Sequence, residues 1–361
     1  MEPHFIQANT SGRLHDAREP SLSALDRGFL YGDSVYEVWR TYDGVIFAFE
    51  EHWQRLERSA RALLLALPVG RAELAAELVR TAAAYVERSG HVGPVYIRVQ
   101  CSRGAGGIGL DMALAENPTY VVLAQRLRAL PVEKLRSGLN LSVARALRRN
   151  PREALDPEWK TGNSLNPLLC LREARSRGAD EVLIPNLAGQ LTEAATANVF
   201  FVRRNTIVTP PLSCGLLGGI TRALLLERIA ARIGATAIEE AITPADLRFF
   251  DSCFLASTVN DLVPVATIDT QCYPVDELQL VWKLKAAFQN FASEYAAGHP
   301  ELRVRTEEAE VAAGAGRAAE AEDACSRRNQ EAGQRSETAR ASLTLPVGPF
   351  ETSSASGSTR Q

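Results

Sequence analysis

The sequence lacks the features that would place the protein in several other functional classes. Its 40 basic and 43 acidic residues give a net charge of −3, so there is no basic excess with which to bind nucleic acid. No apolar run is long enough to cross a membrane. The six cysteines are scattered and form no Cys-x-x-Cys pair, which argues against a zinc site or a disulfide framework. We therefore expect a cytoplasmic protein with no metal site and with neither a nucleic-acid nor a membrane partner.

Lysine is also scarce, since only four of the 40 basic residues are lysines. Arginine stays protonated at neutral pH, whereas lysine can lose its proton and attack a carbonyl group. Lys160 lies in the run Trp-Lys-Thr-Gly-Asn at residues 159–163. We interpret it as a candidate for covalent amine chemistry. The alternative is an ordinary solvated lysine on the surface.

Composition and periodicity divide the chain into a smaller domain at residues 1–130, a larger domain at residues 131–298 and a tail at residues 299–361. Strand-like and helix-like apolar patterns alternate in both domains, which predicts a mixed α and β fold. From residue 301 onward only seven residues are Val, Ile, Leu or Phe. These are too few to offset the entropy lost on ordering the segment, so we expect a disordered, low-complexity tail.

The apolar periods and turn residues predict individual elements. Helices are expected at residues 50–67, 71–88, 163–177, 220–233 and 276–297. Strands are expected at residues 45–49, 94–101, 119–125, 139–145, 181–184, 198–202, 206–209, 236–240 and 252–256.

One glycine-rich segment matches a well-known motif without its context. Residues 104–109 read Gly-Ala-Gly-Gly-Ile-Gly, which fits the G-x-G-x-x-G pattern of dinucleotide-binding folds. That mechanism needs a helix whose N-terminus faces the pyrophosphate. Pro118 and the strand expected from residue 119 leave no room for one. We therefore expect a loop over a pocket and not a dinucleotide site.

Two other segments carry groups suited to a charged cofactor. Residues 215–222 form a glycine turn that leads into an amphipathic helix, and its first N–H groups and the Thr221 hydroxyl suit a phosphate. Simple helix capping is the alternative. Glu193 lies among small residues just before an apolar strand, where a buried carboxylate needs a partner that bears a proton. A ring nitrogen would serve, and a capping role at the strand end is the alternative.

Tyrosines and arginines alternate along two segments. Tyr96 and Arg98 share one face of a predicted strand. Tyr31, Tyr36 and Arg40 lie close together earlier in the chain. Arginine beside tyrosine suits a substrate carboxylate, and pairing on the protein surface is the alternative.

These groups together match the needs of one cofactor. An amine nucleophile, a phosphate cradle, a carboxylate for a ring nitrogen and arginines for acids are what pyridoxal 5′-phosphate catalysis requires. Their order and spacing resemble the class IV aminotransferases, the fold type IV pyridoxal-phosphate enzymes, which include branched-chain aminotransferases, D-amino-acid aminotransferases and aminodeoxychorismate lyases. The resemblance covers residues 5–297, and its motifs lie at residues 26–37, 51–56, 160–163, 191–200, 219–222 and 257–265.

The resemblance implies a small N-terminal α/β domain, a larger C-terminal β-barrel-like α/β domain and a homodimer with the active site at its interface. Lys160 would form the Schiff base with the cofactor and move the substrate's proton. Glu193 would hold the proton of the pyridine nitrogen. The remaining cofactor contacts would come from Arg55, Ile220, Thr221 and Thr258. The expected substrate contacts are Tyr31, Tyr36, Arg40, Tyr96, Arg98 and Val259.

Substrate choice rests on two features that point in different directions. The Tyr96-x-Arg98 strand resembles branched-chain enzymes, and the Arg-x-His pair of D-amino-acid enzymes has no counterpart. The spacing from Lys160 to Asn163, followed by Ser164 where branched-chain enzymes have tyrosine, resembles the D-amino-acid group. We predict transfer of an amino group between an amino acid, an L-branched-chain one, and 2-oxoglutarate. A D-amino-acid aminotransferase or an aminodeoxychorismate lyase is the alternative, and a non-catalytic interaction protein on this fold is a remoter one.

Overall fold

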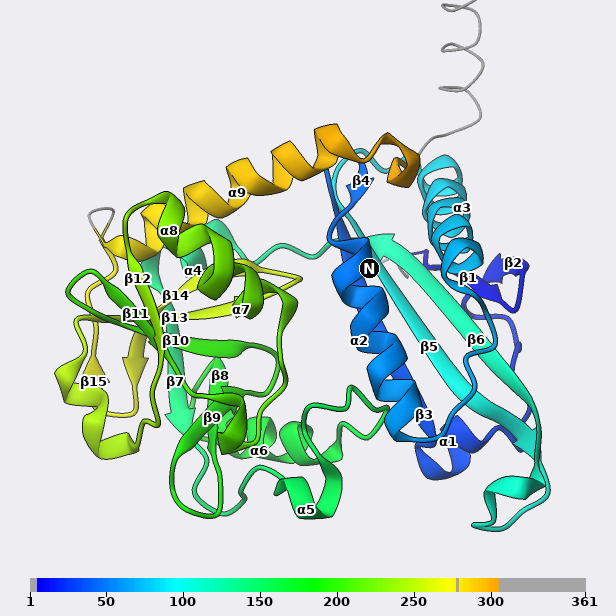
Figure 1. Ribbon diagram of the computed structural model, residues 1–361, viewed down its shortest axis with the longest axis horizontal. Helices are drawn as coiled ribbons and strands as arrows, with labels where there is room; N and C mark the ends of the chain where they lie inside the picture. Colours follow the sequence, from blue (N-terminus) through cyan, green and yellow to red (C-terminus); the bar gives the residue numbers. More distant parts are fainter. Residues whose placement is uncertain (1–4, 277–278, 305–361) are drawn as a thin grey trace, which may run out of the picture. The chain divides into compact units, whose positions relative to one another are not determined.

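A computed structural model describes residues 5–276 and 279–304 (Figure 1). Met1–Thr306 group into one compact unit, which contains two sheets. Of the predicted tail, residues 299–304 are described, and they include a short 3-10 helix, Pro300–Leu302. The rest of the predicted tail lies outside the described residues. Within the described part of the chain, no helix is both long and apolar enough to span a membrane.

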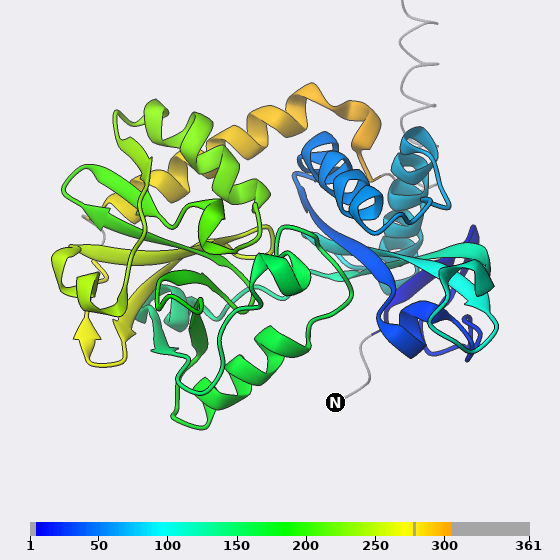
Figure 2. The same ribbon diagram turned by 60° about the horizontal axis from the view of Figure 1, so that its bottom comes forward.

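The N-terminal part forms a six-stranded antiparallel sheet in the order β2-β1-β6-β5-β3-β4. Its strands are β1 (Gln7–Thr10), β2 (Arg13–Asp16), β3 (Ser34–Tyr42), β4 (Val45–Ile46), β5 (Val95–Gly106) and β6 (Ala115–Arg126), and a short helix α1 (Arg27–Tyr31) precedes β3. Helices α2 (Phe49–Ala62) and α3 (Arg71–Ser89) cover one face (Figure 2). Because side chains alternate along a strand, Val35 and Trp39 of β3 pack under these helices. Tyr36 and Val38 are left on the opposite face.

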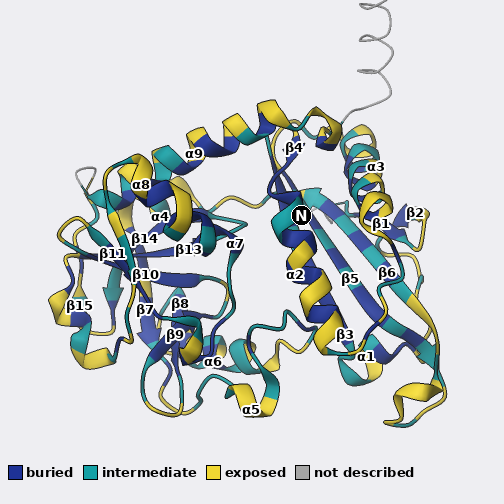
Figure 3. Ribbon diagram, in the orientation of Figure 1, coloured by how far each residue is buried: buried dark blue, intermediate teal, exposed yellow. Residues whose placement is uncertain are grey.

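The C-terminal part forms a nine-stranded mixed sheet in the order β12-β11-β10-β13-β14-β7-β8-β9, with β15 paired to β14. Its strands are β7 (Leu139–Val143), β8 (Glu181–Pro185), β9 (Leu191–Ala194), β10 (Asn198–Arg203), β11 (Thr206–Thr209), β12 (Thr236–Glu239), β13 (Ser252–Ser257), β14 (Asp261–Ile268) and β15 (Gln271–Cys272). The sheet is curled. Side chains of strands that are far apart in this order, such as Leu191 of β9 and Val208 of β11, lie with Leu141 of β7 in one apolar core. The burial colouring of Figure 3 shows dark strands in both parts of the molecule.

Helices cover the outside of the curled sheet. The largest group is a continuous helical run made of α7 (Ile220–Leu224), a π-helical turn (Leu225–Ile229) and α8 (Ala230–Arg232), together with α9 (Leu280–Gly298). The shorter helices are α4 (Val132–Ser137), α5 (Arg152–Leu155) and α6 (Leu165–Arg175). Helix α9 runs from the C-terminal part back toward α3, and Arg303 after it pairs with Val45 of β4 (Figure 1). The last helix therefore joins the two parts.

The predicted mixed α and β fold is confirmed, with differences in several elements. The strand expected at residues 45–49 ends at Ile46, because Phe49 already starts α2. Strand β5 is longer than predicted and runs as far as Gly106, into the glycine-rich segment where a loop was expected, and β6 begins earlier than predicted, at Ala115. A Cβ atom on Gly104 would lie 1.6 Å from the Asn117 oxygen, and one on Gly106 would lie 1.8 Å from the Leu114 oxygen. Gly104 and Gly106 therefore allow β5 to approach β6 and the segment before it, which accounts for the first two glycines of the dinucleotide-like pattern.

Candidate active site

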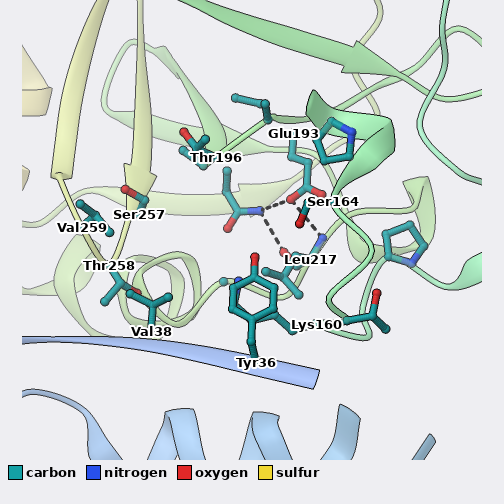
Figure 4. A pocket seen from close by; sticks show the side chains of 18 of the residues that line it. Tyr36, Val38, Lys160, Ser164, Glu193, Thr196, Leu217, Ser257, Thr258 and Val259 are labelled. Atoms are coloured by element: carbon teal, nitrogen blue, oxygen red, sulfur yellow. Dashed lines mark hydrogen bonds between the residues drawn. The ribbon is translucent and has the colours of Figure 1, made fainter. Parts of the chain in front are cut away.

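A cavity of about 460 Å³ opens where β3 and β5 face the curled sheet (Figure 4). Its walls come from α2, the loop before Lys160, α6, the turn between β9 and β10, the start of α7 and the turn between β13 and β14. Ten of the predicted site residues line it: Tyr36, Arg55, Tyr96, Arg98, Lys160, Glu193, Ile220, Thr221, Thr258 and Val259. The structure thus brings together residues that are up to 223 positions apart in the sequence.

Lys160 is positioned by pairing of its backbone with the free edge of β3. The Tyr36 amide donates to the Lys160 carbonyl at 3.0 Å, and the Gly162 amide donates to the Ser34 carbonyl at 2.8 Å. The Ser59 hydroxyl of α2 accepts from the Lys160 amide at 3.1 Å. These bonds fix the Lys160 backbone, and its Nζ lies 4.3 Å from the centre of the Tyr36 ring (Figure 4).

Tyr36 lies between two cationic side chains. The Arg98 guanidinium carbon is 3.9 Å from the centre of its ring, and the Arg98 Nη2 donates to the Gln100 Oε1 at 2.8 Å. The nearby Lys160 charge lowers the pKa of the Tyr36 phenol, against the effect of burial, and Arg98 adds to the lowering. Burial raises the pKa of the neighbouring Tyr96. The two tyrosines therefore differ in how readily they lose a proton.

Glu193 is a buried carboxylate with three donors around it. Its Oε1 lies 2.8 Å from the Arg149 Nη2, and its Oε2 accepts from the Leu217 amide at 3.1 Å and the Asn198 side-chain amide at 3.4 Å. Burial raises the pKa of Glu193, and the Arg149 charge and the Leu217 hydrogen bond oppose that effect. Figure 4 shows the carboxylate pointing into the space that Lys160 and Tyr36 border.

Arg149 is a site residue that the sequence did not reveal. It follows another arginine in the loop before α5, in a chain where 36 of 361 residues are arginine, so nothing in the sequence singles it out. Only the fold shows that its side chain meets Glu193, 44 residues later in the chain.

The start of α7 forms a cradle of N–H groups. The first N–H groups of a helix have no partner inside it, and the helix dipole favours an anion there. Gly219 directly precedes Ile220, and a Cβ atom on it would lie 2.0 Å from the Asn198 Oδ1. Arg55 reaches the same turn, because its Nη1 donates to the Gly218 carbonyl at 2.9 Å. The turn thus combines backbone donors with one guanidinium.

Arg55 is oriented by a buried acidic partner on β3. Its Nε and Nη2 donate to the two oxygens of Glu37 at 2.6 and 2.9 Å, and the His52 Nδ1 lies 2.8 Å from the Glu37 Oε2. Burial alone would raise the pKa of Glu37, but the Arg55 and His52 interactions outweigh it and hold that pKa well below its usual range. Burial lowers the pKa of His52, which favours the neutral imidazole.

This set of groups fits pyridoxal 5′-phosphate. A phosphate would meet the Ile220 and Thr221 N–H groups and Arg55, and a protonated ring nitrogen would meet the Glu193 carboxylate. Lys160 supplies an amine on the wall of the same cavity. Each charged part of the cofactor therefore has a partner of opposite sign or matching hydrogen-bonding type.

Two predicted substrate contacts, Arg40 and Tyr31, are not among the residues that line this cavity in their own chain. The Arg40 Nη1 donates to the Asp261 Oδ1 at 2.8 Å and to the Val259 carbonyl at 3.1 Å, so Arg40 is buried as a brace of the turn before β14. The Tyr31 hydroxyl accepts from the Gly109 amide at 3.0 Å, beside the end of the long hairpin. Sequence proximity to Tyr36 had suggested both.

Comparison with known proteins places these observations in a family. Residues 34–268 match the model of the amino-transferase class IV family. A putative branched-chain-amino-acid aminotransferase of Methanocaldococcus jannaschii is 32% identical over 286 residues, which cover 79% of this chain and 96% of that protein. A D-alanine aminotransferase of Bacillus licheniformis is 29% identical over 267 residues, which cover 72% of this chain and 88% of that one. Among solved structures, the branched-chain amino acid aminotransferase of T.th. with pyridoxamine 5′-phosphate is 26% identical with a TM-score of 0.73, covering 84% of this chain and 100% of that one.

Proposed function

Since the chain belongs to the class IV aminotransferase family, it is a transaminase, and we propose that it moves an amino group between an L-branched-chain amino acid and 2-oxoglutarate with pyridoxal 5′-phosphate as cofactor. The observation that carries the proposal is the meeting of Lys160, Glu193 and Arg98 in one cavity. When bound, the cofactor supplies an aldehyde that condenses with amines and a protonated ring that withdraws electrons from the substrate's α carbon.

The cofactor contacts that we propose use the two ends of the cavity. Arg55, Thr221 and the Ile220 N–H group hold the phosphate, with Thr258 beside them. Glu193 accepts the hydrogen bond of the ring nitrogen. Because Arg55 is fixed by Glu37 and the N–H groups are fixed by the helix, the phosphate site needs little reorganisation when it fills.

Lys160 has two tasks in this proposal. It would hold the cofactor in the resting enzyme, and during the reaction its Nζ would accept the proton from the substrate's α carbon and later return it. Such a transfer needs a neutral amine within hydrogen-bonding reach of that proton. The backbone bonds of Lys160 to β3 and α2 restrict where the Nζ can go.

The cavity also supports the choice of substrates. Tyr96 and Arg98 offer a phenol and a guanidinium to a carboxylate, which both substrates carry and which 2-oxoglutarate carries twice. Val38, Leu168, Leu171 and Val259 add an apolar lining that suits a branched aliphatic side chain. An arginine beside aliphatic residues is the combination that a protein needs to accept an acidic and an apolar substrate in turn.

A D-amino-acid aminotransferase is the second candidate, and one observation favours it. Asn163, three residues after Lys160, donates through its Nδ2 to the Gly32 carbonyl at 3.1 Å, and Ser164 follows where branched-chain enzymes have a tyrosine. The similarity to the D-alanine aminotransferase of Bacillus licheniformis supports the same candidate.

A substrate panel tests the proposal. Purified protein loaded with pyridoxal 5′-phosphate is incubated with 2-oxoglutarate and L-leucine, L-valine, L-isoleucine or the D-enantiomers, and glutamate is measured; a separate incubation with aminodeoxychorismate is assayed for pyruvate. We expect L-glutamate from the L-series. Transfer from D-amino acids alone would support the second candidate, and pyruvate released from aminodeoxychorismate without any transfer would indicate a lyase.

We also propose that the enzyme is a cytoplasmic homodimer with its active site at the interface. Three apolar side chains near the end of the β5–β6 hairpin are exposed, Phe29 at 77%, Ile108 at 78% and Leu110 at 82%. The Arg27 Nη1 of α1 donates to the Gly109 carbonyl at 2.9 Å, so α1, which carries Phe29, lies against the segment that carries Ile108 and Leu110, and we call these three residues the exposed patch. The Tyr31 hydroxyl accepts from the Gly109 amide of the same segment. A reducing compartment agrees with the free thiols of the five described cysteines.

A further inference from the structure

Arg149 is held in place by the fold on both sides of its loop. Its amide donates to the Pro185 carbonyl at the end of β8, at 2.9 Å. The Asn166 side chain of α6 donates to the carbonyl of the preceding Arg148, also at 2.9 Å. Only about a seventh of the Arg149 side chain is exposed, at 14%. Its guanidinium therefore meets Glu193 from a fixed direction.

The surroundings of Glu193 leave Arg149 as its close cationic partner among the described residues. The other groups that face the carboxylate are the Leu217 amide before α7, the Asn198 side chain at the start of β10, and the Lys160 charge across the cavity. Leu217 and Asn198 are neutral donors. Lys160 is engaged in the reaction and cannot serve as a constant charge. Among the described residues, Arg149 alone is both charged and in contact with the Glu193 carboxylate, at 2.8 Å.

A carboxylate next to a pyridine nitrogen shares one proton with it. When the carboxylate is ionised, the proton stays on the ring, and the ring withdraws electrons. When the carboxylate is protonated, it donates to a neutral ring, and that electron withdrawal is lost. Burial favours the second arrangement, since it disfavours charge on the carboxylate, and a guanidinium at hydrogen-bonding distance favours the first.

We propose that Arg149 is a positioning residue that keeps the Glu193 carboxylate ionised and thereby keeps the proton on the ring nitrogen of the cofactor. This inference rests on the proposed function, because it concerns the bound cofactor. Arg149 acts through Glu193, and its charge is what matters. Burial already pushes the pKa of Glu193 upward with Arg149 present, so its removal tips the proton toward the carboxylate.

The test places a ¹⁵N label on the ring nitrogen of pyridoxal 5′-phosphate and records its NMR shift in the loaded protein, which separates a protonated from an unprotonated ring. Arg149→Met removes the charge, and Arg149→Gln repeats the removal with a smaller polar side chain. Arg149→Lys keeps the charge. Glu193→Gln provides the reference for a ring without its acidic partner. Arg145→Gln is the matched control, because Arg145 is 68% exposed and lies 4.0 Å from Asp269.

We expect a protonated ring in the wild-type protein, in Arg149→Lys and in Arg145→Gln. In Arg149→Met and Arg149→Gln we expect the shift to move toward the Glu193→Gln value. Loss of an adjacent opposite charge changes the ratio of ionised to protonated carboxylate about ten- to a thousandfold. The value of kcat should fall in the same two variants and recover in Arg149→Lys.

Three results would overturn the inference. The first is an ¹⁵N shift that stays unchanged in Arg149→Met or Arg149→Gln, whichever of the two binds the cofactor. That result would mean that Arg149 supports the structure of the site without controlling the proton. A shift in Arg149→Lys as large as in Arg149→Gln shows that shape and not charge is at work. A wild-type protein that takes up no cofactor contradicts the proposed function itself, which separates that failure from the first two.

Discussion

At the scale of single residues, the pairing of Glu37 with Arg55 and His52 is the clearest case of a site built from buried charge. The Glu37 side chain has no exposed surface, and both of its oxygens are bound to α2. A buried ion pair of this kind contributes little more to the stability of the fold than an apolar pair would. The loss of one partner, however, leaves an unpaired buried charge, which is strongly destabilising. Its value here lies in fixing the Arg55 guanidinium.

Replacement of Glu37 by glutamine should lower the free energy of unfolding at pH 7 by about 3–5 kcal/mol. The pKa of Glu37 is depressed in the folded protein, so its stabilising effect is present above the ordinary value of 4.5 and declines as the pH falls below it. The destabilisation by Glu37→Gln should therefore be smaller at pH 3.5 than at pH 7. Denaturant unfolding of the wild-type protein and the variant at the two pH values measures this difference in the free energy of unfolding.

Glu50→Gln is the control for that experiment. Glu50 also pairs with an arginine, Arg71 at 2.7 Å, but both side chains are about half exposed, at 44% and 57%. An exposed pair contributes up to about 1 kcal/mol. An equal loss of stability in the two variants would contradict the special role of the buried pair.

At the scale of elements, the entry into α7 shows how a turn shapes a binding site. Gly219 has no room for a side chain because the Asn198 Oδ1 fills the space, while Gly218 has open space up to Leu212 at 3.8 Å. Asn198 also donates to the Leu217 carbonyl at 2.9 Å and so ties β10 to the turn. The turn is held from both sides.

Substitution of Gly219 by alanine should displace Asn198 and the first N–H groups of α7. We expect a cost of about 1–3 kcal/mol in stability, as for other overpacked sites, and a weaker affinity for pyridoxal 5′-phosphate. Gly218→Ala should leave both quantities close to wild type. Thermal unfolding of the apoprotein and fluorescence titration with the cofactor measure the two effects, and identical behaviour of the two variants would speak against the cradle.

The sequence predicted this turn well because its signals are local. Glycines followed by an amphipathic pattern indicate a helix entry wherever they occur. Strands such as β1, β2 and β14 were not predicted, since short or fully buried strands carry little periodicity of their own. The role of Gly104 and Gly106 was also hidden, because it depends on the backbone of the neighbouring strand β6 and the segment before it.

The candidate site was predictable where a family motif carried it and not where the fold alone created it. Lys160, Glu193 and Arg55 lie in recognisable motifs, and all three line the cavity. Arg149 has no such motif, because its role arises from a contact between a loop and a distant strand. Arg40 lies near Tyr36 in the sequence, yet Asp261 draws its guanidinium away from the cavity.

At the scale of the whole molecule, the exposed patch of Phe29, Ile108 and Leu110 sets an expectation for assembly. Phe29→Glu should weaken the proposed homodimer at least about tenfold, since burial of a phenylalanine contributes about 1.5–3 kcal/mol. Val92→Glu is the control, because Val92 is 95% exposed but precedes the other end of β5. Sedimentation velocity over a concentration series measures the effect. A wild-type monomer, or equal behaviour of both variants, would contradict the proposed interface.

The central claim is that Lys160 and its neighbours carry out transamination, and a half-reaction tests it most directly. Holoenzyme is mixed with L-leucine without any acceptor, and the 2-oxo acid product is counted per active site. We predict that one equivalent of the 2-oxo acid forms per active site and that the reaction then stops. Turnover should resume once 2-oxoglutarate is added. Lys160→Ala should slow this step about 10²- to 10⁴-fold, while Lys134→Ala, which alters a partly exposed pair with Asp180, should not. Absence of the 2-oxo acid, continued turnover without an acceptor, or full activity in Lys160→Ala would contradict the account.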